Sequence, residues 1–192
     1  EEIRRVEAGA AGPVGLSVLQ RARLEIRRGN LDQAEALLLR PTLAGEPGRI
    51  EALLLLVERR AQSGDGAGAA RALAPVAVLA KSRRLPEPWL SELPFWTGLV
   101  ARARNDVATA LSEWAGLLAA DPGSFAAERA LARIAELPPA SRERFVTAAR
   151  ADGRRLLRAG KAAAAKSRLL PAAALGDAEA KDALLEAYRA LP

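Results

Sequence analysis

Arginine side chains at four-residue spacing are the clearest candidates for ligand binding in this sequence. Three predicted helices carry them: Arg23 and Arg27; Arg129 and Arg133; and Arg150, Arg154 and Arg158. Residues four apart lie on the same face of a helix, and a guanidinium group can hold a carboxylate or phosphate through two parallel hydrogen bonds. We predict that the last five of these arginines form one basic patch for an acidic partner. A solvated helix face is the alternative.

Aromatic side chains are the second candidates for binding, because Trp is enriched at the centres of protein interfaces. Five of the seven aromatic residues fall within 37 positions, namely Trp89, Phe95, Trp96, Trp114 and Phe125. We expect Trp114 and Phe125 to belong to the core. We predict that Phe95 and Trp96 contact a partner segment together with Leu54 and Leu99, and either Trp89 or Trp96 could be an exposed anchor.

The composition removes most routes to catalysis. The chain has no His and no Cys, which excludes disulfides, thiol nucleophiles, His-dependent acid–base chemistry and the usual nitrogen and sulfur metal ligands. The Gly64–Gly68 segment lacks the preceding strand and the glycine pattern of a phosphate-binding loop. The sequence therefore predicts a protein that is not an enzyme and that uses no cofactor and no metal.

The elements that must position these side chains are helices. Ala and Leu number 45 and 31 of the 192 residues, whereas Val, Ile and Thr together number 17. Ala, Leu, Arg and Glu favour helices, and strands favour β-branched residues. Segments of 9 to 19 residues with apolar side chains three and four apart alternate with Gly, Asn and Pro breaks. We expect an all-α protein of about eleven helices, in which short turns join antiparallel neighbours.

Several local features refine this outline. The segment 81–90 is the longest predicted loop and a possible hinge in an otherwise single helical domain of residues 1–192. Ser91 could cap the next helix and leave Pro94 in its first turn. An extra helix is expected at 124–137. The first residues, 1–6, look like the tail of a helix, which suggests a piece of a longer chain.

A fixed spacing recurs along the chain. A small residue is followed by a turn residue at +7, by Ala at +12 and by a large apolar residue at +16. Three segments show all four positions: Ala22, Gly29, Ala34 and Leu38; Gly98, Asn105, Ala110 and Trp114; and Gly153, Gly160, Ala165 and Leu169. A fourth segment has Val57 in place of the small residue, followed by Gly64, Ala69 and Leu73. Small residues let two helices approach closely, so the spacing predicts repeated helix pairs.

These strings resemble the tetratricopeptide repeat family, whose units are helix–turn–helix pairs of about 34 residues. The resemblance is carried by Gly29–Leu38 and by Ala110 with Trp114 and the later Asp121-Pro122, while Ala172–Tyr188 looks like related repeats. Turn positions 29, 64, 105 and 160 are unevenly spaced, so the array is irregular. The resemblance implies an α-solenoid that binds a peptide or protein on its concave face.

Charge leaves the class of partner open. The net charge is +6, and a basic surface can bind an acidic protein or a nucleic acid. We expect an interaction scaffold for a peptide or protein, with nucleic-acid binding or a structural, self-associating role as alternatives. The Arg-rich, Lys-poor composition suggests a bacterial protein. No membrane-spanning stretch is visible, so we expect a soluble chain. The compartment stays open: the sequence favours the bacterial cytoplasm, but removal of an export signal would leave the same sequence.

Overall fold

The protein is built from helices throughout the part that the structure, a computed structural model, describes, which is residues 16–191. These residues form ten α-helices and one 3₁₀ turn, and no strand. The predicted all-α fold of helix pairs is thereby confirmed. The expected helix tail at 1–6 lies outside the described residues.

The contacts divide the chain into two compact units at Leu85 and Pro86. The boundary falls inside the segment 81–90, whose role as a hinge stays a prediction. We refer to residues 16–85 as unit 1 and to residues 86–191 as unit 2.

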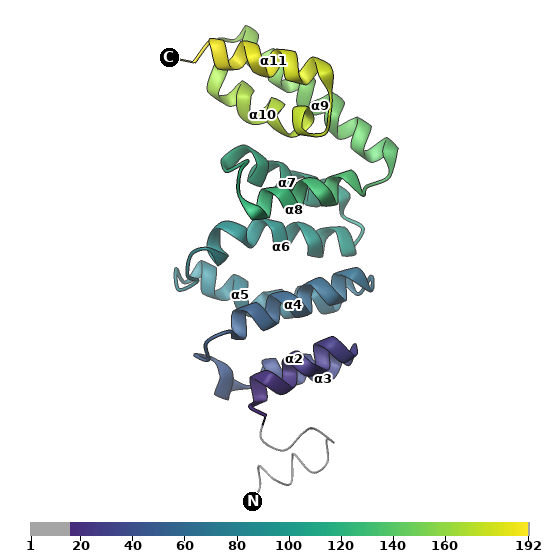
Figure 1. The fold of residues 1–192 in the computed structure, drawn as a ribbon, viewed down its shortest axis with the longest axis vertical. Helices are drawn as coiled ribbons and strands as arrows, with labels where there is room; N and C mark the ends of the chain where they lie inside the picture. Colours follow the sequence, from purple (N-terminus) through teal and green to yellow (C-terminus); the bar gives the residue numbers. More distant parts are fainter. Residues whose placement is uncertain (1–15, 192) are drawn as a thin grey trace, which may run out of the picture. The chain divides into compact units, whose positions relative to one another are not determined.

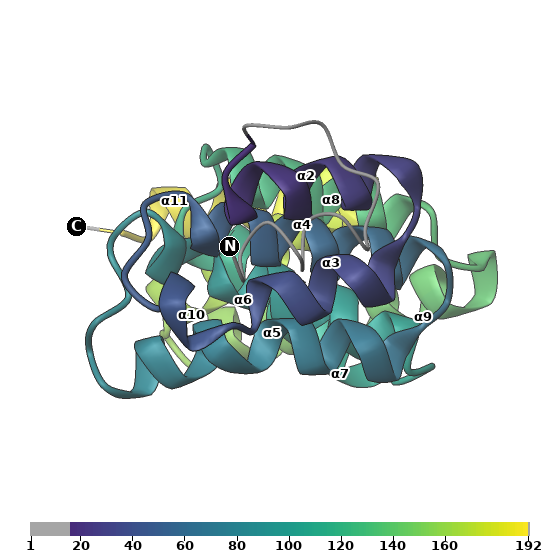
Figure 2. The same ribbon diagram turned by 90° about the horizontal axis from the view of Figure 1, so that it is seen from below.

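Unit 1 consists of two helix pairs joined through a short 3₁₀ turn (Figures 1 and 2). Its elements are α2 (Val18–Arg28), α3 (Leu31–Leu38), η1 (Pro41–Leu43), α4 (Arg49–Gln62) and α5 (Gly66–Lys81). Figure 2 shows α2 and α3 side by side, and both contact α4. Ser17 begins the first helix because its hydroxyl accepts a hydrogen bond from the Gln20 N–H, while the Gln20 side chain bonds back to Ser17.

Unit 2 contains two further pairs, with one helix between them and one after them. Its helices are α6 (Trp89–Ala103), α7 (Val107–Ala120), α8 (Phe125–Ala135), α9 (Pro139–Arg158), α10 (Ala162–Ala174) and α11 (Ala178–Arg189). α6 packs on α7 and α9 packs on α10, while α7 also contacts α8 and α10 (Figure 1). α11 contacts α9 and α10. The extra helix expected at 124–137 is α8.

The recurring spacing coincides with four helix pairs: α2 with α3, α4 with α5, α6 with α7, and α9 with α10. The turn residue has a positive φ in every case, from 62° at Asn105 to 82° at Gly29. That left-handed conformation ends the first helix and admits Gly or Asn readily. The Ala at +12 is fully buried in all four pairs, and the large residue at +16 is at most 7% exposed. The repeat of helix pairs predicted from the sequence is confirmed.

Two glycines in unit 2 explain why the first position of the spacing is small. A Cβ atom added to Gly98 would lie 2.3 Å from Nε1 of Trp114. A Cβ atom added to Gly153 would lie 2.3 Å from Cγ of Leu169. In both pairs the glycine of the first helix has no side chain, and the large residue of the second helix packs directly on the backbone of the first helix.

One local expectation was wrong. α6 begins at Trp89, its cap is Pro88, and Pro94 lies at its sixth residue rather than in its first turn. The Ser91 hydroxyl instead donates a hydrogen bond to the carbonyl of Pro88 at 2.7 Å. Pro94 has no N–H, so the carbonyl of Leu90 lacks its usual helical donor.

Candidate functional site

The arginines predicted to form a basic patch mostly face acidic side chains of the protein itself. Arg150 lies 3.0 Å from Asp177 and 3.5 Å from Glu179, and Arg154 lies 3.2 Å from Glu179. These contacts join α9 to the start of α11. Because each positive charge has a negative neighbour within unit 2, Arg150 and Arg154 serve packing between helices.

The remaining members of that predicted patch are divided between two helices. Arg133 pairs with Glu136 at 3.1 Å, and Arg102 reaches the same carboxylate at 2.9 Å. These arginines hold the pKa of Glu136 below its usual value despite partial burial; the hydrogen bond from Arg102 contributes most. Arg158 is exposed at the end of α9. The prediction of one continuous basic patch is therefore corrected. Arg133, Arg150 and Arg154 form ion pairs within the protein, and Arg158 alone does not make a patch.

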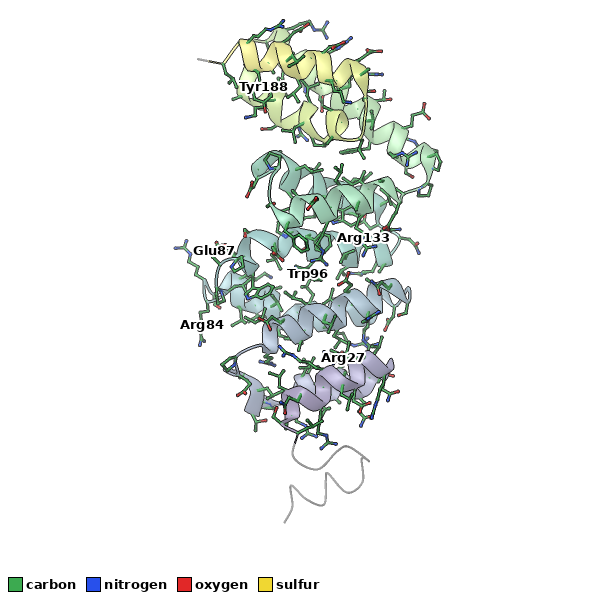
Figure 3. The ribbon with its side chains drawn as sticks, in the orientation of Figure 1. Arg27, Arg84, Glu87, Trp96, Arg133 and Tyr188 are labelled. Carbon is green, nitrogen blue, oxygen red and sulfur yellow. The ribbon has the colours of Figure 1, made fainter. Side chains whose placement is uncertain are left out.

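The guanidinium group of Arg129 lies over aromatic rings. Its guanidinium carbon lies 4.1 Å from the ring centre of Phe95, 4.8 Å from that of Trp96 and 5.6 Å from that of Phe125. Guanidinium groups over aromatic faces are attracted by the ring quadrupole. Figure 3 labels Trp96 and Arg133, which are carried by α6 and α8.

The predicted aromatic anchors belong to the core. Phe95 is fully buried and Trp96 is 5% exposed, with their rings edge to face at 5.1 Å. Trp114, fully buried as predicted, donates a hydrogen bond from Nε1 to the carbonyl of Phe95 at 3.2 Å. Leu54 and Leu99 are buried as well. The prediction that these side chains contact a partner is thus corrected. They are core residues: Leu54, Phe95, Trp96 and Leu99.

Phe125 is the opposite case. We expected it in the core, but its side chain is 67% exposed, and Leu90 is 43% exposed. Phe125 is the first residue of α8, directly after the Ser124 cap, whose hydroxyl accepts a hydrogen bond from the Ala127 N–H. At that position the side chain has no preceding helical turn to pack on.

An apolar groove of about 500 Å³ lies beside Phe125 within unit 2. It is formed where the start of α6, the end of α7 and the start of α8 meet. Its apolar wall includes Leu90, Pro94, Leu117, Phe125 and Ala126. The volume falls in the range of sites that hold a side chain or a small ligand. Sequence patterns do not reveal this groove, because its residues come from three helix ends and share no spacing.

The polar residues of the groove are acidic or neutral. Glu92 and Asp121 line it together with Ser91 and Ser124, and no lining residue is basic. Asp121 follows the last residue of α7, and that helix has no basic residue in its last turn. The carboxyl end of a helix carries a partial negative charge, so the charged lining side chains and this helix end are negative, while the Arg129 guanidinium lies 5.6 Å from the ring centre of Phe125.

Unit 1 contains a buried cluster of charges that has a structural role. Arg60 of α4 is 4% exposed and contacts Asp32, Glu35 and Asp65, and Arg71 binds the same Glu35 at 3.0 Å. Burial opposes the charge of Arg60, but the hydrogen bonds that its guanidinium donates to Asp32 and Asp65, together with the charge of Glu35, keep its pKa above the ordinary value. The cluster ties α4 to α3 and α5.

No group of three or more His, Cys, Asp and Glu residues that could hold a metal ion occurs among the described residues. Within residues 16–191, none of the helices combines the length and apolar character needed to cross a membrane.

Comparison with known proteins leaves the family open. No family model matches the chain, and no curated protein and no solved structure matches it significantly. The resemblance to tetratricopeptide repeats stays a prediction. The site must therefore be interpreted from its own geometry.

Proposed function

We propose that this protein is a non-enzymatic interaction module that binds a short segment of another protein in the groove of unit 2. The observation that carries the proposal is the exposed ring of Phe125 beside an apolar groove of about 500 Å³. Exposure of an aromatic ring to water is unfavourable, so burying this ring under an apolar side chain of a partner would lower the free energy of binding. The ends of three helices, α6, α7 and α8, form the groove.

The groove replaces the two surfaces suggested by the sequence. Phe95 and Trp96 are buried, and Arg150 and Arg154 have acidic neighbours. Those ion pairs also weigh against the alternative of nucleic-acid binding, because phosphate groups would have to displace carboxylates that are already bound.

A selection from a random peptide library against the whole chain tests the proposal. We expect enriched peptides to share an apolar anchor and to lose binding to Phe125→Ser. Val78→Ser is the matched control, since Val78 is 63% exposed but lies on α5 of unit 1. Failure to enrich any peptide, or equal loss of binding in both variants, would overturn the proposal.

A further inference from the structure

From the charges around the groove we infer that its occupant carries a basic residue next to its apolar anchor. This inference rests on the proposed function and adds the chemistry of the partner. It runs against the acidic partner expected from the net charge of +6. What matters at the groove is the local charge, because charges beyond about 8–10 Å are screened at physiological salt.

Two carboxylates in the groove have no cationic partner of their own. Glu92 of α6 is half-buried and Asp121 is exposed. Neither side chain makes an ion pair or a hydrogen bond within residues 16–191. This sets them apart from Glu35, Glu136, Asp177 and Glu179, which all contact arginines. The charges of these two carboxylates are therefore available to a cation bound in the groove.

The position of Asp121 adds to the electronegative character. Its backbone carbonyl accepts hydrogen bonds from the Ser124 N–H at 3.2 Å and from the Ser124 hydroxyl at 2.8 Å. These bonds fix the turn between α7 and α8 and hold the carboxylate close to the end of α7. A carboxylate near the C-terminus of a helix faces the negative end of the helix dipole, whereas a cation is favoured there. A lysine or arginine of a bound segment would supply that cation.

The helices that form the groove also have backbone acceptors without a helical donor. Pro94 leaves the carbonyl of Leu90 without its usual helical donor, and the last turn of α7 ends in carbonyl groups that have no intrahelical donor. Ammonium and guanidinium groups are donors only, so they match such a surface. The apolar wall binds the anchor, and the acidic groups select the residue beside it.

The experiment compares charge-matched peptides on whole-chain variants. The probes are fluorescein-labelled versions of a peptide selected as above, with two Lys, two Glu or two Ser flanking the apolar anchor. We expect the Lys version to bind wild type about tenfold more tightly than the Glu version at 50 mM salt, with a smaller ratio at 500 mM. Affinity is measured by fluorescence anisotropy.

Reversing the charges of Glu92 and Asp121 tests whether these two side chains select the basic peptide. In the double variant Glu92→Lys with Asp121→Lys, the order of the Lys and Glu peptides should invert. The control is Asp182→Lys with Glu186→Lys, which changes the net charge equally on exposed positions of α11 and should keep the wild-type order. Circular dichroism verifies that both double variants are folded.

The outcomes separate this inference from the proposed function. If the Lys and Glu peptides bind equally well and both need Phe125, the groove binds peptides but the basic partner is wrong. If the α11 variant inverts the order as well, the preference reflects net charge and the inference is also wrong. If no peptide depends on Phe125, the proposed function itself fails.

Discussion

Units 1 and 2 use the same helix-pair geometry but fill the space between helices with different chemistry. In unit 1 a Cβ atom added to Gly68 would lie 2.1 Å from a carboxylate oxygen of Asp65 and 2.5 Å from Cδ of Arg60. In unit 2 the space at Gly98 is occupied by the indole of Trp114. A close approach of helices can therefore be held by a buried ion cluster or by an apolar ring. The two solutions should respond differently to mutation and to pH.

The distribution of fluorophores makes this comparison measurable in the intact chain. All three Trp residues and the single Tyr belong to unit 2, at positions 89, 96, 114 and 188. Tyr188, labelled in Figure 3, lies on α11. Tryptophan fluorescence therefore reports the unfolding of unit 2, while far-ultraviolet circular dichroism reports helices in both units.

The largest effect is expected for Arg60→Ala in unit 1. This change leaves Glu35, which is 8% exposed, without its main buried partner. Breaking a buried ion pair by removing one member costs about 3–5 kcal/mol. In urea, circular dichroism should show an early loss of helix that tryptophan fluorescence does not follow.

The matched control for that change is Arg102→Ala in unit 2. Arg102 pairs with Glu136, but both side chains are partly exposed, at 33% and 47%. Such pairs contribute about 1 kcal/mol or less. Equal destabilisation by the two alanine variants would show that the buried cluster is no more important than a surface pair.

The second effect is expected for Gly98→Ala in unit 2. The new methyl group would overlap the Trp114 indole and disturb its hydrogen bond to Phe95. Overpacking of this kind costs about 1–3 kcal/mol, and tryptophan fluorescence should show the earlier unfolding. Gly116→Ala on α7 is the control, because no atom lies within 4 Å of its added Cβ; replacing a helical Gly by Ala there should stabilise by up to about 1 kcal/mol.

The third effect concerns the stability of unit 1 at acidic pH. The Gly68 N–H and then the Arg60 guanidinium hold the pKa of Asp65 below its ordinary value in the folded state. A lowered folded pKa adds stability above the unfolded pKa of about 3.9, and this stability is lost as the pH falls through the folded pKa. Asp65→Asn keeps a capping side chain but cannot titrate. We expect lower stability at pH 7 and a smaller loss of helix stability from pH 5 to pH 2.

Unit 2 provides the comparison for the acid prediction. Hydrogen bonds from the side chain and backbone of Thr109 lower the pKa of Asp106, and Arg102 with Arg133 lowers that of Glu136. Asp65→Asn should leave the acid response of tryptophan fluorescence unchanged. A parallel shift in both signals would contradict an effect confined to unit 1.

The smallest effect on stability is expected for Phe125→Ser. Its ring is 67% exposed, and the Arg129 guanidinium lies 5.6 Å from the ring centre. The cost should stay below about 1 kcal/mol. Phe95→Ala, at a fully buried ring, should cost about 3–5 kcal/mol. Comparable melting temperatures for these two variants would mean that Phe125 is a core residue after all.

The sequence predicted the helix pairs well because their signal is local. The small residue, the turn residue and the two buried positions of a pair lie within 17 residues, and one physical requirement fixes them all. The ion pair between Arg150 and Asp177 spans 27 positions, so the spacing of arginines alone could not reveal that its charge is already neutralised.

The groove was beyond the reach of sequence patterns for a related reason. Leu90, Leu117 and Phe125 come from three helix ends, where the periodicity of apolar residues says nothing about burial. The prediction that Phe125 belongs to the core is wrong, because its position directly after the Ser124 cap places it outside the packed face. Pro94 was expected to begin its helix, and only the observed start of α6 shows that it lies in the wall of the groove.

Chemical-shift mapping of the whole chain with a selected Lys-bearing peptide tests the central claim most directly. Amide signals are recorded by two-dimensional ¹⁵N–¹H nuclear magnetic resonance as the peptide is added. The account predicts that the largest shifts fall on residues 88–94 and 116–126, with signals of unit 1 unchanged. Saturable shifts centred on Arg150 and Arg154, or on unit 1, would contradict it.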